Sequence, residues 1–286
     1  MKKLILLLLF IPLVFACSDN TNIEVEDGEN LLLIGHSFFK PYAENLDIVA
    51  LDAGYQNHNS TLVFRGGKNG RPINFWNDST SQEHQEIKYA LDQGGLDFFG
   101  MTSDHDSVNP IEGHKNWIEY AIQNNPNITI FISITPLDFP AGDPNGTRPN
   151  WNLFSIENGF NSIQELYEYY VNEIIHKEIV DELRIIFPTT NIFTIPTGWA
   201  TKNLAQMQLD DLLLDEIGLF GPKPSSIFTD PKGHQGQIVI EAGTLIWLNS
   251  IYNEELSGNN YETGFNTDLH SIAEDIMNSH DSDYKK

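Results

Sequence analysis

A serine, a histidine and an aspartate stand where they could form a hydrolytic site. Ser37 follows the aliphatic run 31–34 and the turn residue Gly35, which places it directly after a buried strand. Asp230 and His234 lie late in the chain, in a loop that precedes an apolar helical segment. Serine hydrolysis needs a nucleophile, a histidine base, an acid that orients the base, and donors for the oxyanion. These three residues could supply the first three parts.

Two further strand ends could supply the oxyanion donors. The predicted strand 60–64 runs into Gly66 and Gly67, and the predicted strand 96–100 is followed by Thr102. The carboxyl ends of parallel strands lie along one edge of a sheet, and open α/β sheets bind their ligands there. We therefore expect a glycine amide and the Thr102 hydroxyl to lie near Ser37.

Each of these residues also has an ordinary structural role. A serine before a helix can cap it, an aspartate before a proline commonly opens a turn, and paired glycines serve tight turns. A histidine or threonine in a loop can cap a neighbouring element or simply be solvated. The residue types alone leave both interpretations open for Ser37, Gly66, Gly67, Thr102, Asp230 and His234.

The order of the predicted elements indicates an α/β fold. Apolar or β-branched runs alternate with helical patterns along one domain, which favours a doubly wound, mainly parallel sheet between two helical layers. The segment 135–158 is rich in Pro, Gly, Asn and Asp and is predicted to be a long loop or lid. Strands are predicted at 31–35, 60–64, 96–100, 127–134 and 191–195, and helices from 41 onward, at 81–93, 111–124 and 162–187, within 199–219, and at 236–252.

The charge of the chain limits the classes of partner that the protein can bind. Lys and Arg total 16 against 40 Asp and Glu, which gives a formal net charge of −24. This balance argues against nucleic acid, because phosphate contacts need a basic surface, and against docking on anionic lipid. Hydrophobic residues make up 40% of the chain, which is enough for a substantial core. A small-molecule or carbohydrate ester is compatible with this composition.

The residue pattern of the N-terminus predicts a targeting segment. Lys2 and Lys3 precede an apolar run, 4–15, that is too short to span a bilayer. The residues before Cys17 resemble the lipobox of bacterial lipoproteins, in which the cysteine is lipidated. An ordinary secretory peptide with an incidental cysteine is the alternative. We expect a lipoprotein signal peptide at 1–17, a flexible tether at 18–30, a domain at 31–253, and an acidic, weakly ordered tail at 254–286. The protein would then be lipid-anchored in a bacterial cell envelope, facing the periplasm or the surface, with the anchor as its only membrane contact.

Taken in order, these motifs resemble the SGNH, or GDSL-like, hydrolases, over about residues 31–252. Residues 35–38 are similar to the first block of that family, and Ser37 matches its nucleophile. Gly66 or Gly67, with Gly67 preferred, matches the glycine of the second block, and Asp230 and His234 are similar to the last block. The resemblance implies a flavodoxin-like α/β/α sandwich with a five-stranded sheet, ester hydrolysis without a cofactor, and an oxyanion hole of Ser37, Gly67 and Thr102.

The chain departs from the family pattern at three positions. His36 stands where aspartate or asparagine is commoner, Thr102 replaces the usual asparagine, and three residues rather than two separate Asp230 from His234. The threonine leaves open a second hypothesis, a weakly active or inactive surface lipoprotein that binds glycans on the same fold. A group of acidic and histidine side chains leaves open a third hypothesis, a metal-dependent phosphoesterase. The spacing of these side chains matches no closed zinc site. Those side chains are Asp104, His105, Asp106, His36 and His114.

The sequence thus predicts an esterase that works through an acyl-enzyme, with acylated glycans as a candidate substrate. Ser37 would attack, His234 would move the proton, and Asp230 would orient His234. Tryptophans in or near the predicted loops could stack on sugar rings, although buried packing is their commoner role. They are Trp76, Trp151 and Trp199.

Overall fold

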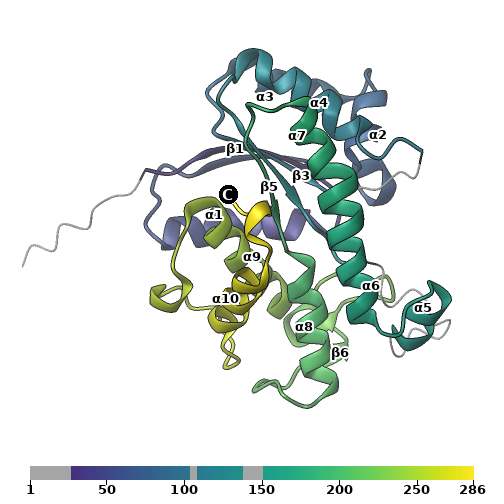
Figure 1. Ribbon diagram of the computed structural model, residues 1–286. Coiled ribbons are helices and arrows are strands. Elements are labelled where there is room, and N and C mark those ends of the chain that lie inside the picture. The colour runs from purple at the N-terminus through teal and green to yellow at the C-terminus, as the bar shows by residue number, and fades with distance from the viewer. Residues whose placement is uncertain (1–26, 104–107, 138–150) are drawn as a thin grey trace, which may run out of the picture.

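A five-stranded parallel sheet forms the centre of the molecule (Figure 1). The computed structural model describes residues 27–103, 108–137 and 151–286. Neighbouring strands pair in the order β2-β1-β3-β4-β5, and every pairing is parallel. This order is typical of flavodoxin-like sheets. The strands are β1 (Asn30–Gly35), β2 (Asn59–Phe64), β3 (Phe98–Thr102), β4 (Thr129–Ser133) and β5 (Ile192–Ile195).

The inner strands are apolar because helices cover both of their faces. All residues of β1 after Asn30 are buried, as are all residues of β3. A strand that is buried on both sides has no polar face and therefore reads as a continuous hydrophobic run. The edge strand β2 has only one buried residue, Val63, and its composition is correspondingly more polar. The α/β fold with a five-stranded parallel sheet, predicted from the sequence, is confirmed.

Helices form a layer on each face of the sheet (Figure 1). In one layer, α1 (Lys40–Asp52) packs along α9 (Gln237–Tyr252), and α8 (Gly198–Leu209) and α10 (Leu269–Ser279) also contact α9. The other layer holds the helices that connect β2 to β3, β3 to β4, and β4 to β5. They are α2 (Pro72–Asn77), α3 (Gln82–Gln93), α4 (Glu112–Asn124), α5 (Trp151–Glu157), α6 (Ile163–Tyr169), the π-helix η3 (Tyr170–Asp181) and α7 (Glu182–Ile186).

The C-terminal region corrects one prediction from the sequence. The segment 254–286 was predicted to be weakly ordered, but it contains α10 and two short 3-10 helices, η5 (Leu256–Gly258) and η6 (Ser282–Tyr284). The apolar residues of α10 recur at the spacing of one helical face and pack on α9, so they extend the core. They are Leu269, Ala273, Ile276 and Met277.

Two short strands before α9 were also not predicted. β6 (Gly218–Phe220) and β7 (Ser226–Phe228) form a separate parallel pair, with the 3-10 helix η4 (Lys223–Ser225) between them. β7 leads into the loop with Asp230 and His234. The predicted helix 162–187 is present as the continuous run α6–η3–α7, whose middle part has π-helical bonding.

Several predictions lie outside the described residues. They are the signal peptide with Cys17, most of the tether, the centre of the predicted lid, and Asp104, His105 and Asp106. Among the residues that the structure does describe, no helix combines the length and the apolar character needed to cross a bilayer.

Candidate active site

Ser37, His234 and Asp230 form a hydrogen-bonded chain. The Ser37 Oγ lies 2.8 Å from the His234 Nε2, and the His234 Nδ1 lies 2.5 Å from the Asp230 Oδ2. The Nδ1–H therefore donates to the carboxylate, and the Nε2 is left to accept the proton of the serine hydroxyl. Residues that are 197 positions apart in the sequence thus have the geometry of a nucleophile, a base and an orienting acid.

The turn between β1 and α1 presents Ser37. The amides of Phe39 and Lys40 both donate to the His36 carbonyl, at 2.9 and 3.0 Å, and close this turn immediately after the strand. The N-cap of α1 is Phe39, and no side chain caps it. The alternative role of Ser37 as a helix cap is therefore not what the structure shows, since its hydroxyl meets His234 instead.

A tight turn between β7 and α9 brings Asp230 and His234 together despite their three-residue gap. The second carboxylate oxygen of Asp230 accepts from the amides of Lys232, at 2.9 Å, and His234, at 3.3 Å. Gly233, with φ of +90°, supplies the left-handed conformation that the turn requires. The Thr229 amide closes the turn on the His234 carbonyl at 2.8 Å. The three residues between Asp230 and His234 thus let the backbone of the turn donate two hydrogen bonds to the Asp230 carboxylate.

The carboxylate of Asp230 is held in its charged form. Partial burial raises the pKa of Asp230. Hydrogen bonds from the His234 ring and from the His234 and Lys232 amides lower it by more, so the net shift is downward. An ionised acid next to the Nδ1 fixes the imidazole tautomer and stabilises the imidazolium that forms when His234 takes a proton.

Phe38 holds the histidine ring from one side. Its ring stacks on that of His234, with centroids 5.0 Å apart and an interplanar angle of 14°. The Gln235 side chain donates to the Phe38 carbonyl at 3.2 Å and so ties the two loops together. Sequence reasoning did not single out Phe38 or Gln235, although their positions next to Ser37 and His234 were a usable signal.

Gly67 presents a backbone amide near the nucleophile. It begins the 3-10 helix η1 (Gly67–Gly70), has φ of +56°, and lines the same cavity as Ser37. The first amide of a helix has no partner within that helix, and among the described residues no other group accepts from the Gly67 or Ser37 amides. Both amides can therefore donate to a ligand oxyanion.

Gly70 lets η1 approach the nucleophile turn. A Cβ at Gly70 would lie 2.7 Å from the Gly35 carbonyl oxygen and 2.8 Å from the Cα of His36. Only a glycine permits this contact, which fixes the η1 amides relative to Ser37. The Arg65 amide donates to the Gly35 carbonyl at 3.2 Å and adds to the same junction.

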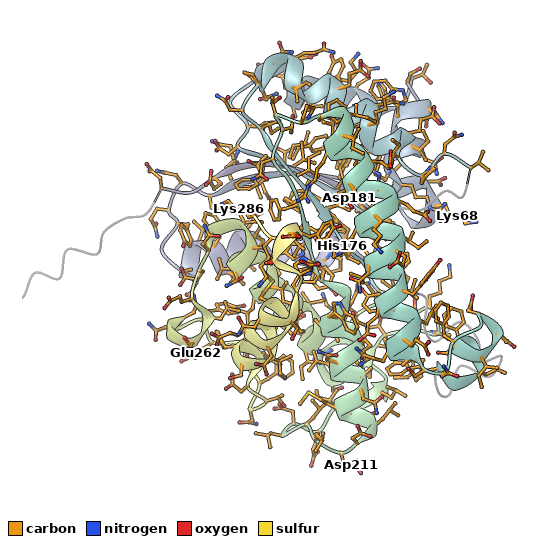
Figure 2. The ribbon with its side chains drawn as sticks, viewed as in Figure 1. Lys68, His176, Asp181, Asp211, Glu262 and Lys286 are labelled. Atoms are coloured by element: carbon orange, nitrogen blue, oxygen red, sulfur yellow. The ribbon has the colours of Figure 1, made fainter. Side chains whose placement is uncertain are left out.

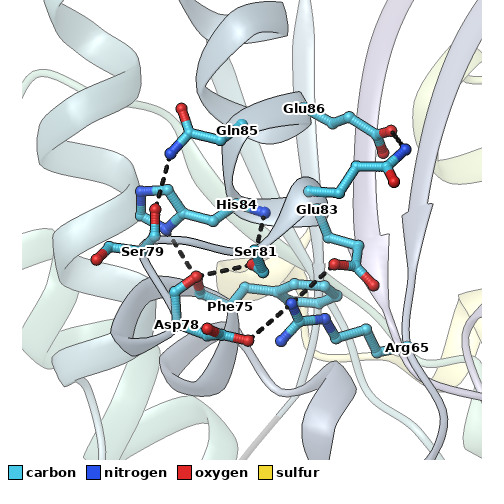
Figure 3. A network of polar contacts seen from close by, with 10 residues as sticks. Arg65, Phe75, Asp78, Ser79, Ser81, Glu83, His84, Gln85 and Glu86 are labelled. Carbon is cyan, nitrogen blue, oxygen red and sulfur yellow. Dashed lines mark hydrogen bonds and ion pairs between the residues drawn. The ribbon is translucent and has the colours of Figure 1, made fainter.

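An ion-pair network anchors the segment that carries Gly67 (Figure 3). The Arg65 guanidinium contacts Glu83 at 2.8 Å and Asp78 at 3.0 Å, and so joins the end of β2 to the α2–α3 region. The hydrogen bond to Glu83 is the main reason that the pKa of Arg65 lies above its ordinary value. In the same network, the His84 Nδ1 lies 2.9 Å from the Phe75 carbonyl oxygen.

Thr102 is the buried last residue of β3 and contacts His36. Its side chain is fully buried, and its hydroxyl lies 3.2 Å from the His36 Nε2. The His36 Nδ1 accepts from the Phe38 amide at 3.2 Å, so its Nε2–H donates to Thr102. The His114 Nε2 donates to the Thr102 carbonyl at 3.1 Å. Thr102 is not among the residues that line the cavity, unlike its neighbour Ser103.

Ser103 and Thr135 both line the cavity and carry hydroxyl groups. The Ser103 Oγ accepts from the Thr135 amide at 3.1 Å and lies 3.2 Å from the Thr135 Oγ1. The structure thus brings Ser37, Gly67, Asp230 and His234 together as predicted from their order, and it places Ser103 rather than Thr102 at the cavity wall.

The cavity in front of Ser37 has a volume of about 650 Å³. None of the three tryptophans considered for sugar stacking lines it. No metal-ligating cluster of His, Cys, Asp or Glu occurs among the described residues, which do not include Asp104–Asp106. The lining residues are His36, Ser37, Phe38, Gly66, Gly67, Lys68, Arg71, Ser103, Thr135, Pro136, Leu137, Phe154, Tyr170, Lys232 and His234.

Comparisons with known proteins add little to this geometry. No family model and no curated protein matches the chain. Among solved structures, the periplasmic domain of a lipopolysaccharide acetyltransferase from Salmonella ser. Paratyphi A is similar, with 15% identity and a TM-score of 0.41. The match covers 80% of this chain and 84% of that chain. A likeness of this size carries no argument about function.

Proposed function

We propose that this protein is a serine esterase that works through an acyl-enzyme. The observation that carries the proposal is the chain from Ser37 through His234 to Asp230, which borders a cavity large enough for a substrate. Activation of a serine hydroxyl requires a base within hydrogen-bond reach and an acid that orients this base, and both distances meet that requirement. The SGNH-type family assignment remains part of this proposal.

The reaction follows from the positions of the protons. His234 takes the proton of the Ser37 hydroxyl as the oxygen attacks the ester carbonyl, and the imidazolium then gives this proton to the leaving alcohol. A water molecule loses its proton to His234, attacks the acyl-enzyme and releases the carboxylic acid, while Ser37 regains its proton. One ester and one water become one acid and one alcohol, so no cofactor is required.

The amides of Ser37 and Gly67 are the proposed oxyanion donors, with Ser103 as the third. Donors that are fixed in advance stabilise the charge of the tetrahedral intermediate most effectively, because they need not reorganise during the reaction. The Thr102 hydroxyl, which the family resemblance implies as a donor, meets His36 instead. We assign Thr102 the role of holding His36, and through His36 the turn that presents Ser37.

The substrate we propose is an acylated glycan at the cell envelope. Aromatic and apolar side chains line part of the cavity and suit a sugar face or a short acyl chain. They are Phe38, Pro136, Leu137, Phe154 and Tyr170. Lipidation at Cys17 would hold the enzyme at the membrane where such glycans occur.

A turnover screen tests this proposal. Short acyl 4-nitrophenyl esters and acetylated polysaccharides are incubated with the wild type, with Ser37→Ala, and with the exposed-serine control Ser279→Ala, each with and without a chelator. We expect turnover by the wild type and the control but not by Ser37→Ala. Glycan binding without turnover would instead support a binding protein, and activity that the chelator removes would support a metal-dependent enzyme.

A further inference from the structure

We propose that the substrate carries a negatively charged group, such as a carboxylate, within reach of Lys68 and Lys232. This inference rests on the proposed esterase function and names the class of ester that the site selects. Its basis is the charge of the described residues that line the cavity, which is opposite in sign to that of the chain as a whole.

The contrast in charge is large. Acidic residues outnumber basic ones by 40 to 16 in the sequence. Of the described residues that line the cavity, three are cationic, Lys68, Arg71 and Lys232, and none is Asp or Glu. A concave site lined by one sign of charge concentrates ligands of the opposite sign, and low-dielectric walls strengthen this effect. In an acidic protein, such a site also stands out against a surface that repels anions.

Both lysines belong to segments that hold the catalytic groups. Lys68 directly follows Gly67 in η1, and Lys232 lies inside the turn in which the Asp230 carboxylate accepts from the Lys232 amide. Their backbones are therefore fixed relative to the oxyanion site and to His234. A substrate anion that reached both lysines would be held next to the segments that carry the oxyanion donor and the base.

The two ammonium groups are available to a ligand. Both side chains are exposed, and neither ammonium has an ion-pair or hydrogen-bond partner among the described residues. Figure 2 shows Lys68 at the outer side of the molecule. Arg65, only three residues before Lys68, by contrast pairs with Glu83 and Asp78. Among the described residues, Arg65 thus has two carboxylate partners, whereas Lys68 and Lys232 have none.

Arg71 brings a third cationic side chain to the cavity, close to His36. Burial, and then the charges of Arg71 and His234, lower the pKa of His36 to about 4. A neutral His36 adds no charge of its own, so Arg71 is the cationic group beside it. The charged side chains of the described lining therefore favour a substrate anion over a cation. The apolar residues described above leave room for an uncharged acyl or sugar face beside that anion.

Two matched substrate pairs test the inference and distinguish the source of the charge. In the first pair, the acetyl ester of a methyl glucuronoside is compared with that of the methyl glucoside acetylated at the same position. In the second pair, 4-nitrophenyl hemisuccinate is compared with 4-nitrophenyl butyrate. The first pair places the carboxylate on the alcohol and the second places it on the acyl group. The enzymes are the full chain, Lys68→Gln/Lys232→Gln, and Lys223→Gln as a matched charge control outside the cavity.

We expect the wild type to prefer the charged member of at least one pair by roughly ten-fold in kcat/KM at low ionic strength, mostly through KM. This preference should shrink with added salt, disappear in the double variant, and persist in Lys223→Gln. Lys68→Glu/Lys232→Glu should reverse it. Equal kcat/KM values within both pairs, or a preference that survives the double variant, would overturn the inference and leave the esterase function standing. If the wild type hydrolyses no ester at all, the proposed function fails, and the inference fails with it.

Discussion

Two buried histidines should make the fold sensitive to mild acid. His176 of η3 and His280 after α10 lie on either side of the Thr194 hydroxyl, at 3.1 and 2.9 Å (His176 is labelled in Figure 2). Burial, and then the charge of His280, lower the pKa of His176 to about 3. Burial, and then the charge of Lys285, lower the pKa of His280 to about 4. Both rings are therefore neutral in the folded protein near pH 7.

The sign and size of the effect follow from linkage. In the unfolded chain a histidine titrates near its ordinary pKa of about 6.5, so acid protonates the unfolded state first and stabilises it. The stability that the two histidines contribute is fully present above that pKa and is lost as the pH falls from about 6.5 toward 4 and 3. At pH 5 each group lowers the free energy of unfolding by about 2 kcal/mol relative to pH 7.5, or about 4 kcal/mol together.

Urea unfolding at pH 7.5 and pH 5.0, followed by circular dichroism, measures this difference. His176→Gln/His280→Gln should lose about 4 kcal/mol less than the wild type over the same pH change. Thr194→Val is the matched control, because it removes the shared hydroxyl but keeps both rings, and it should retain most of the pH dependence. An identical pH dependence in the wild type and the double variant would show that these two histidines do not cause the sensitivity to acid.

Three further predictions concern the site and the anchor. His234→Ala should abolish most turnover, Asp230→Ala should cost less, and the double variant should resemble His234→Ala, because the two residues act as a unit; additive losses in kcat/KM would contradict this. Ser103→Ala should lower kcat on the order of ten-fold or more, because it removes an oxyanion donor. Thr102→Val should instead act through the turn at Ser37 and should also lower thermal stability. The reverse pattern would return the donor role to Thr102. Cys17→Ala should release the protein from membranes, and a variant that still sediments with lipid would show that the lipobox interpretation is wrong.

The sequence predicted correctly those elements that a single local residue pattern determines. The aliphatic run before Gly35 predicts a strand that is buried on both faces, and the following serine then falls at the edge where parallel sheets bind ligands. The same logic applied to the strands other than β2, together with the alternation of strands and helices, predicts the α/β fold. These predictions succeed because burial on both faces leaves a continuous apolar run that can be read directly from the residue types.

The oxyanion side shows how a small error in a strand boundary changes a functional prediction. The sequence predicted the third strand at 96–100, whereas β3 spans Phe98–Thr102. This shift of two residues moves Thr102 from the loop into the last position of the strand, where it is buried, and places Ser103 at the cavity. Strand ends depend on pairing with neighbours that are distant in the sequence, which local residue patterns do not encode.

Other features depended on contacts that no local pattern encodes. The approach of η1 to the nucleophile turn at Gly70 depends on a neighbour 35 positions away, Gly35. The gap between Asp230 and His234 could be judged only from the turn that the backbone forms around the carboxylate. The apolar stripe of α10 was present in the sequence, but the acidic and polar residues around it obscured the helical period.

The most direct test of the central claim is covalent labelling of the nucleophile. The full chain is treated with a fluorophosphonate at neutral pH, and the adduct is located by peptide mass spectrometry. We expect a single adduct on Ser37, no adduct in Ser37→Ala, and much slower labelling in His234→Ala, since the base activates the serine oxygen. An adduct on another serine, or no adduct on a protein that hydrolyses esters, would contradict the assignment of Ser37, His234 and Asp230 as the active site.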